Sequence, residues 1–107
     1  MPEPTNRRAT ERFPVNASTS CSFLSPVVED FGPAKIKNIS MDGIGLLLAQ
    51  SLEPGTLLAI SLSNPARNFT KTVLVRVAHM TPDHGTYLVG GSFTTPLTYE
   101  ELSKLVL

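Results

Sequence analysis

Residues 69–93, FTKTVLVRVAHMTPDHGTYLVGGSF, carry the clearest structural pattern in the chain. Every second residue from 73 to 77 is a valine, so these valines share one face of a long strand, and Thr72, Leu74 and Arg76 take the other. The TPDHG stretch, residues 81–85, predicts a turn, and residues 86–93 predict a second strand. Gly90 and Gly91 within that strand indicate a bulge or a close approach of two backbones.

The stretches on either side repeat this pattern of strands separated by turns. Residues 57–62 of TLLAISLS put Leu58, Ile60 and Leu62 on one face. The LEPG stretch before them, residues 52–55, predicts a turn, and NPARN after them, residues 64–68, predicts a polar loop.

The first half of the chain gives weaker strand signals. Residues 13–24, FPVNASTSCSFL, predict a first strand with Pro14 near its start, and residues 27–33 predict a strand end followed by a turn. Residues 34–40 and 44–49 flank Asp42 and Gly43. This pair predicts a short hairpin, because glycine accepts a positive φ without a clash at Cβ.

The last twelve residues, PLTYEELSKLVL, change to a helical period. Thr98 and Glu101 match the T-x-x-E pattern of a capping box. Apolar residues at helical spacing predict one buried stripe: Tyr99, Leu102, Leu105 and Val106. About six strands followed by one helix predict a mainly β fold, as a small antiparallel barrel or a sandwich.

Composition limits the possible functions of these 107 residues. The chain is 41% hydrophobic with a mean hydropathy of +0.07, which is typical of a globular domain. Nine basic and nine acidic residues give a net charge of zero, which argues against binding of long nucleic acid. The sequence shows no signal peptide and no membrane span, so we expect a cytoplasmic protein. Cys21, the only cysteine, predicts a small packed residue rather than a disulfide or a metal ligand.

The residues suited to catalysis are few. His79 and His84 are five positions apart with no further metal ligands or bases at matched spacing, so they predict a strand end and a turn tip. The GIG stretch, residues 43–45, lacks the third glycine and the following helix of a dinucleotide-binding loop. We therefore expect no enzyme, no cofactor and no metal.

Two clusters remain, and their chemistry is complementary. Arg7, Arg8 and Arg12 in RRATER offer forked donors that suit phosphate oxygens or the O6/N7 edge of guanine. The NISMDG stretch, residues 38–43, offers an amide that can read a base edge, a hydroxyl, and a glycine. Considered separately, the arginines also fit a solvated tail, and Asn38 and Ser40 also fit a cap at the end of a hairpin.

Together these clusters make the chain resemble the PilZ domain family of bacterial cyclic di-GMP receptors. Arg8 and Arg12 fit its R-x-x-x-R motif, and residues 38–43 fit its [D/N]-x-S-x-x-G motif, with one strand between the two. Asparagine stands where aspartate is commoner. The resemblance covers nearly the whole chain. It implies a six-stranded antiparallel β-barrel of Greek-key type with a short C-terminal helix, residues 13–107, after a flexible arm, residues 1–12.

The resemblance also implies residue roles. Arg8 and Arg12 would contact phosphates and guanine, Asn38 and Ser40 would hydrogen-bond a guanine, and Gly43 would shape the turn beneath it. Arg7 stands just before the motif, at a position that in the family influences whether one ligand or a stacked pair binds. Ordering of the arm would be the signal, passed to an unidentified downstream protein by a monomer or weak homodimer.

Two other functions stay open. The chain could be a PilZ-like adaptor that acts by protein contact without cyclic di-GMP. A barrel that binds single-stranded nucleic acid is disfavoured, because such sites need basic grooves and aromatic residues, and only 7% of residues here are aromatic.

Overall fold

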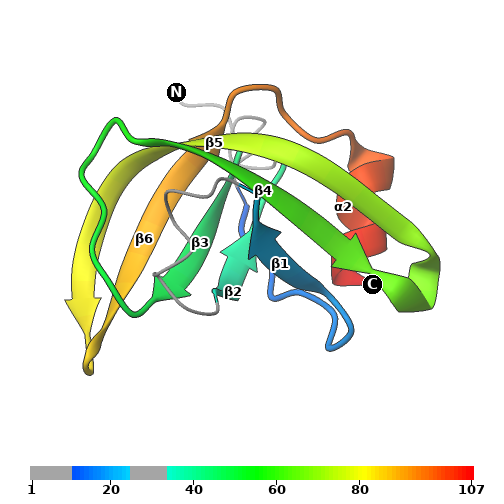
Figure 1. Ribbon diagram of the computed structural model, residues 1–107. Coiled ribbons are helices and arrows are strands. Elements are labelled where there is room, and N and C mark those ends of the chain that lie inside the picture. Colours follow the sequence, from blue (N-terminus) through cyan, green and yellow to red (C-terminus); the bar gives the residue numbers. More distant parts are fainter. Residues whose placement is uncertain (1–10, 25–33) are drawn as a thin grey trace, which may run out of the picture.

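The structure is a computed structural model that describes residues 11–24 and 34–107. In these ranges six antiparallel strands form one strongly curved sheet in the order β1-β4-β5-β6-β3-β2, with one helix after the last strand (Figure 1). The predicted mainly β fold is confirmed, and the sheet is a half-barrel whose two edges are β1 and β2. The elements are β1 Ser20–Phe23, β2 Lys35–Ile39, β3 Gly43–Leu48, β4 Leu57–Asn64, the 3-10 turn η2 Pro65–Arg67, β5 Phe69–Asp83, β6 Thr86–Phe93 and α2 Tyr99–Val106.

The faces predicted for β4 and β5 are confirmed. Leu58, Ile60 and Leu62 of β4 are buried, and so are the three alternating valines of β5. β5 continues to Asp83, so the prediction of a turn over residues 81–85 was too long. The turn consists of His84 and Gly85, both with positive φ, and this tight connection lets the pairing of β5 with β6 continue to its end.

The first strand is shorter than predicted. Of the predicted residues 13–24, the ones that pair regularly with β4 are Ser20–Phe23. Residues 17–18 form a turn. Pro14 has no N–H to extend a ladder, and the side chain of Asn16 accepts a hydrogen bond from the Ser18 N–H at 2.7 Å. Phe13 makes a single bridge to Ile39 of β2. The strand end predicted over residues 27–33 lies outside the described residues.

The capping box predicted at the start of α2 is confirmed. The Thr98 hydroxyl accepts from the Glu101 N–H at 3.1 Å, and the Glu101 carboxylate accepts from the Thr98 N–H at 2.9 Å. Leu102 and Leu105 are buried as predicted. Tyr99 is 75% exposed, which corrects the predicted stripe, because it starts the helix where the chain leaves the core.

The end of α2 is tied to the segment before β1. The Asn16 N–H and the Thr19 hydroxyl both donate to the Leu105 carbonyl, at 2.9 and 2.8 Å. The fully buried side chain of Asn64 donates to the Lys104 carbonyl at 2.8 Å. These bonds satisfy carbonyls that a helix end leaves unpaired, so the end of the helix is held by the segment before β1 and by the end of β4. Across the described ranges, no helix has the length and apolar character needed to cross a membrane.

Candidate functional site

The two motifs meet because the chain before β1 pairs with the end of β2. The Phe13 N–H donates to the Ile39 carbonyl, and the Ile39 N–H donates to the Phe13 carbonyl, both at 2.9 Å. This reciprocal pair fixes Arg12 beside the β2–β3 turn. Residues separated by 26 positions in sequence therefore become neighbours.

Arg12 and Asn38 are in direct contact. Nη1 of Arg12 donates to Oδ1 of Asn38 at 3.0 Å, on the outer surface of the sheet. Arg12 is exposed and Asn38 half-buried. A guanidinium has five N–H donors, so most of its donors stay available to an anion, and the Asn38 amide nitrogen stays available as a donor. The pair offers charged and neutral donors side by side.

A bulge directs Asn38 outward. The pairing of β2 with β3 shifts register between Ile36 and Asn38, so that Lys37 is the extra residue. Strict alternation from Ile36 would put Asn38 in the core and Ile39 in solvent. The extra residue reverses this, and Ile39 is fully buried while Asn38 faces outward.

Ser40 closes the turn from inside. Its side chain is buried, and its hydroxyl oxygen accepts from the N–H groups of Asp42 and Gly43 at 3.2 and 3.1 Å. The hydroxyl also donates to the Gly43 carbonyl at 3.4 Å. The hairpin cap is therefore present, and a contact between Ser40 and a ligand stays a prediction.

Gly43 is required by packing rather than by its φ. The described glycines with positive φ are Gly55 and Gly85, so the φ argument made for Gly43 was wrong. A Cβ at position 43 would overlap the carbonyl oxygen of Gly91 on β6. The close backbone approach predicted for Gly91 is therefore confirmed on its β3 side. It is also confirmed across β5, where a Cβ on Gly91 would lie 2.9 Å from the Arg76 carbonyl oxygen.

Gly45 is a site residue that the sequence patterns missed. It pairs with Asn38 across β2 and β3, and a Cβ there would lie 2.8 Å from the Oδ1 that Arg12 contacts. A glycine inside a strand signals such close approach, so the signal was present in the GIG stretch. Arg7 and Arg8 lie outside the described residues, and their part in the site stays a prediction.

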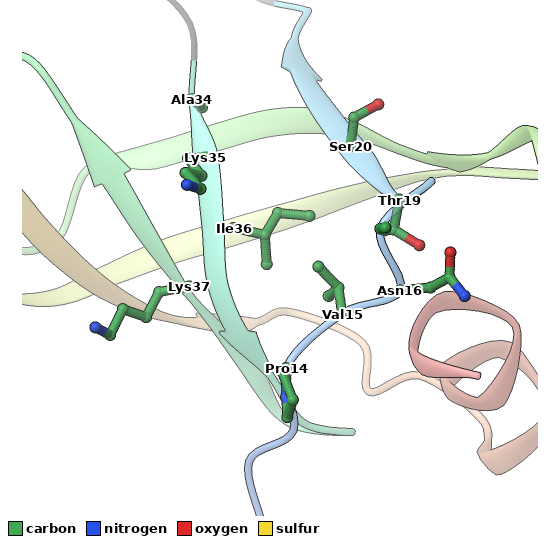
Figure 2. A pocket seen from close by; sticks show the side chains of 10 residues that line it. Pro14, Val15, Asn16, Thr19, Ser20, Ala34, Lys35, Ile36 and Lys37 are labelled. Atoms are coloured by element: carbon green, nitrogen blue, oxygen red, sulfur yellow. The ribbon is translucent and has the colours of Figure 1, made fainter.

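A hollow lies at the open seam between β1 and β2. It has a volume of about 350 Å³ between residues 14–20 and the start of β2, and Val15 and Ile36 project into the gap (Figure 2). Lys35 and Lys37 line its β2 side. Of the predicted site residues that the structure describes, none lines it (Arg12, Asn38, Ser40 and Gly43), so it is separate from the contact of Arg12 with Asn38.

Among the described residues, His84 and Cys21 are groups suited to catalysis that lie in different parts of the fold. Nδ1 of His84 lies 2.8 Å from an Asp83 carboxylate oxygen at the tip of the β5–β6 hairpin. Burial raises the pKa of the Cys21 thiol to about 11, which keeps it protonated and a poor nucleophile at neutral pH. Among residues 11–24 and 34–107, no group of three histidine, cysteine or acidic side chains could hold a metal ion.

Comparison with known families adds one finding. The family model described as the PilZ domain matches residues 6–107, which is essentially the whole chain. A search of curated proteins gave no significant match.

Proposed function

The chain belongs to the PilZ domain family, and on that basis we propose that it is a non-catalytic receptor for cyclic di-GMP. The observation that carries the proposal is the 3.0 Å contact between Arg12 and Asn38, one residue from each motif. Cyclic di-GMP combines two phosphates with two guanine bases, so it needs charged donors and base-reading amides close together.

In this proposal the outer surface at the β2–β3 turn receives the ligand. Arg8 and Arg12 bind phosphate oxygens and a guanine edge, and the Asn38 amide reads a guanine. Ser40 also hydrogen-bonds the guanine, and Gly43 shapes the turn beneath it. The bond from the Gly43 N–H to the Ser40 hydroxyl supports a place for both residues at this turn. Arg7 takes part in setting whether one ligand or a stacked pair binds.

The proposed signal is the closing of the arm, residues 1–12, over the ligand. The bridge from Phe13 to Ile39 supports this, because it gives the arm a fixed end next to the binding surface. Closing costs conformational entropy, which the charge-assisted hydrogen bonds must exceed. A cytoplasmic downstream protein would read the closed arm, and the receptor would be a monomer or weak homodimer.

Calorimetric titration with cyclic di-GMP tests the proposal. We expect Arg8→Ala and Arg12→Ala each to cost about 1.5–3 kcal/mol per charged hydrogen bond lost, or roughly 10- to 150-fold in Kd. Arg67→Ala is the matched control, because Arg67 is an exposed arginine in η2, on the β4–β5 connection. Equal affinities for wild type, Arg8→Ala and Arg12→Ala would refute the arginine contacts, and no binding by wild type would refute the receptor.

A further inference from the structure

Four residues form one straight row across the sheet. Asn38 of β2 pairs with Gly45 of β3, Gly45 pairs with Gly90 of β6, and Gly90 pairs with His79 of β5. Directly opposed residues in antiparallel strands point to the same face. His79 therefore lies on the same outer face as Asn38, separated from it by two glycines.

The two glycines bring the flanking side chains together. Oδ1 of Asn38 lies 2.8 Å from the Cβ that Gly45 lacks, and Nε2 of His79 lies 2.7 Å from the Cβ that Gly90 lacks. Each side chain thus leans inward over bare backbone. Adjacent strands are roughly 4.8 Å apart, so the imidazole ring lies about one strand spacing from the Asn38 amide.

A second bulge directs His79 outward. The pairing of β5 with β6 shifts register between Val77 and His79, which leaves Ala78 as the extra residue. Val77 is buried and His79 is exposed. The row therefore has a register shift at each end, Lys37 on β2 and Ala78 on β5, and bulges of this kind re-aim side chains beside functional sites.

The imidazole is available for a ligand. In the part of the chain that the structure describes, the side chain of His79 makes no hydrogen bond and no ion pair, whereas that of His84 bonds Asp83. Arg76, which pairs with Ser92 in the next row on this face, is likewise exposed and adds positive charge to the same outer face. An aromatic ring with a polar edge beside a base-reading amide suits a planar purine.

We propose that His79 is a further ligand-contacting residue, which packs against the guanine that Asn38 reads. This inference rests on the proposed binding of cyclic di-GMP. It extends the site from the two motifs, on the arm and the β2–β3 turn, to the middle of β5. The glycine pair at 45 and 90 is then the floor of the base site.

The test is a calorimetric titration of His79→Ala, His79→Phe and the control His84→Ala with cyclic di-GMP. We expect His79→Ala to weaken binding about tenfold, as loss of one contact between a base and an aromatic ring does. His79→Phe keeps a ring and should retain most of the affinity. His84→Ala removes the other histidine, at the hairpin tip, and should bind like wild type.

The outcomes separate this inference from the proposed function. If wild type binds and Arg12→Ala weakens binding, but His79→Ala matches His84→Ala, the role of His79 alone is refuted. If wild type does not bind, both are refuted. The chain has two histidines, so proton NMR gives an independent readout. The Cε1 proton of His79 should shift on ligand addition more than that of His84, and the reverse order would contradict the contact.

Discussion

At the scale of single residues, two glycines near Asn38 should differ in whether their substitution lowers the stability of the fold or the affinity for the ligand. Gly43 and Gly45 both lie in β3, two positions apart, and a Cβ at either would be too close to a neighbour. The neighbour of Gly43 is a backbone carbonyl, which cannot move alone. The neighbour of Gly45 is the end of the Asn38 side chain, which can rotate away. The same substitution at the two positions should therefore have different effects.

We expect Gly43→Ala to lower the free energy of unfolding by about 3 kcal/mol, at the upper end of the usual cost of overpacking. Gly45→Ala should cost about 1 kcal/mol or less, but it should displace Asn38 and weaken binding of cyclic di-GMP several-fold. Urea unfolding followed by calorimetric titration measures both quantities. Equal losses of stability in the two variants would contradict the packing described around these glycines.

Single residues show how far the sequence could predict the site. Residue types and spacing were enough to select Arg12 and Asn38, because guanidinium and amide chemistry is local to the side chain. The reason for Gly43 could not be predicted, because the clash is with Gly91, a residue on another strand. The GIG stretch signalled a close approach at Gly45, but that Asn38 is the neighbour depends on the register between β2 and β3, and so does the position proposed for His79 on the register between β5 and β6.

At the scale of elements, an ion pair between β5 and α2 makes the stability of the fold depend on pH. Nζ of Lys71 on β5 lies 2.7 Å from the Glu101 carboxylate, which also accepts from the Thr98 N–H. The hydrogen bond from Lys71 and then the one from Thr98 lower the pKa of Glu101 below its ordinary value. The folded state therefore favours the charged carboxylate. This contribution to stability is present above the unfolded pKa and is lost as pH falls through the folded pKa.

We expect Glu101→Gln to be less stable than wild type at pH 6, by about 1 kcal/mol, since it weakens the capping box and removes a partly exposed ion pair. The difference should shrink at an acid pH below the lowered folded pKa of Glu101, where the wild-type carboxylate is protonated. Glu100→Gln is the control, because that neighbour is 80% exposed and lies 3.9 Å from Lys104. Urea unfolding at both pH values measures this, and a pH-independent difference for Glu101→Gln would contradict it.

The elements with strong periodicity were the ones that the sequence predicted well. The faces of β4 and β5 and the cap of α2 depend on local alternation and on one short motif. The first strand was predicted too long because Asn16 and Pro14 interrupt it: they favour a turn and an isolated bridge over regular pairing. The outward position of Asn38 depends on the bulge at Lys37, which weak alternation over residues 34–40 did not reveal.

At the scale of the whole molecule, the half-barrel leaves β1 and β2 as separate edges, and the segment from Phe13 to Thr19 runs between them. That segment bonds β2 at Phe13 and the end of α2 at Asn16 and Thr19. The residue just before it, Arg12, contacts Asn38 in the proposed ligand site. A ligand held by Arg12 and Asn38 should therefore raise the free energy of unfolding of the whole domain. The boundary of the arm at residue 12 stays a prediction.

Thermal unfolding with and without cyclic di-GMP tests the central claim most directly. A ligand at a hundredfold excess over its Kd adds about 2.7 kcal/mol to the folded state, which for a domain of this size raises Tm by about 10 °C. We predict a rise of that order for wild type and for Arg67→Ala, and a much smaller one for Arg12→Ala at the same ligand concentration. An unchanged wild-type Tm at millimolar cyclic di-GMP would contradict the account and favour an adaptor that acts without this ligand.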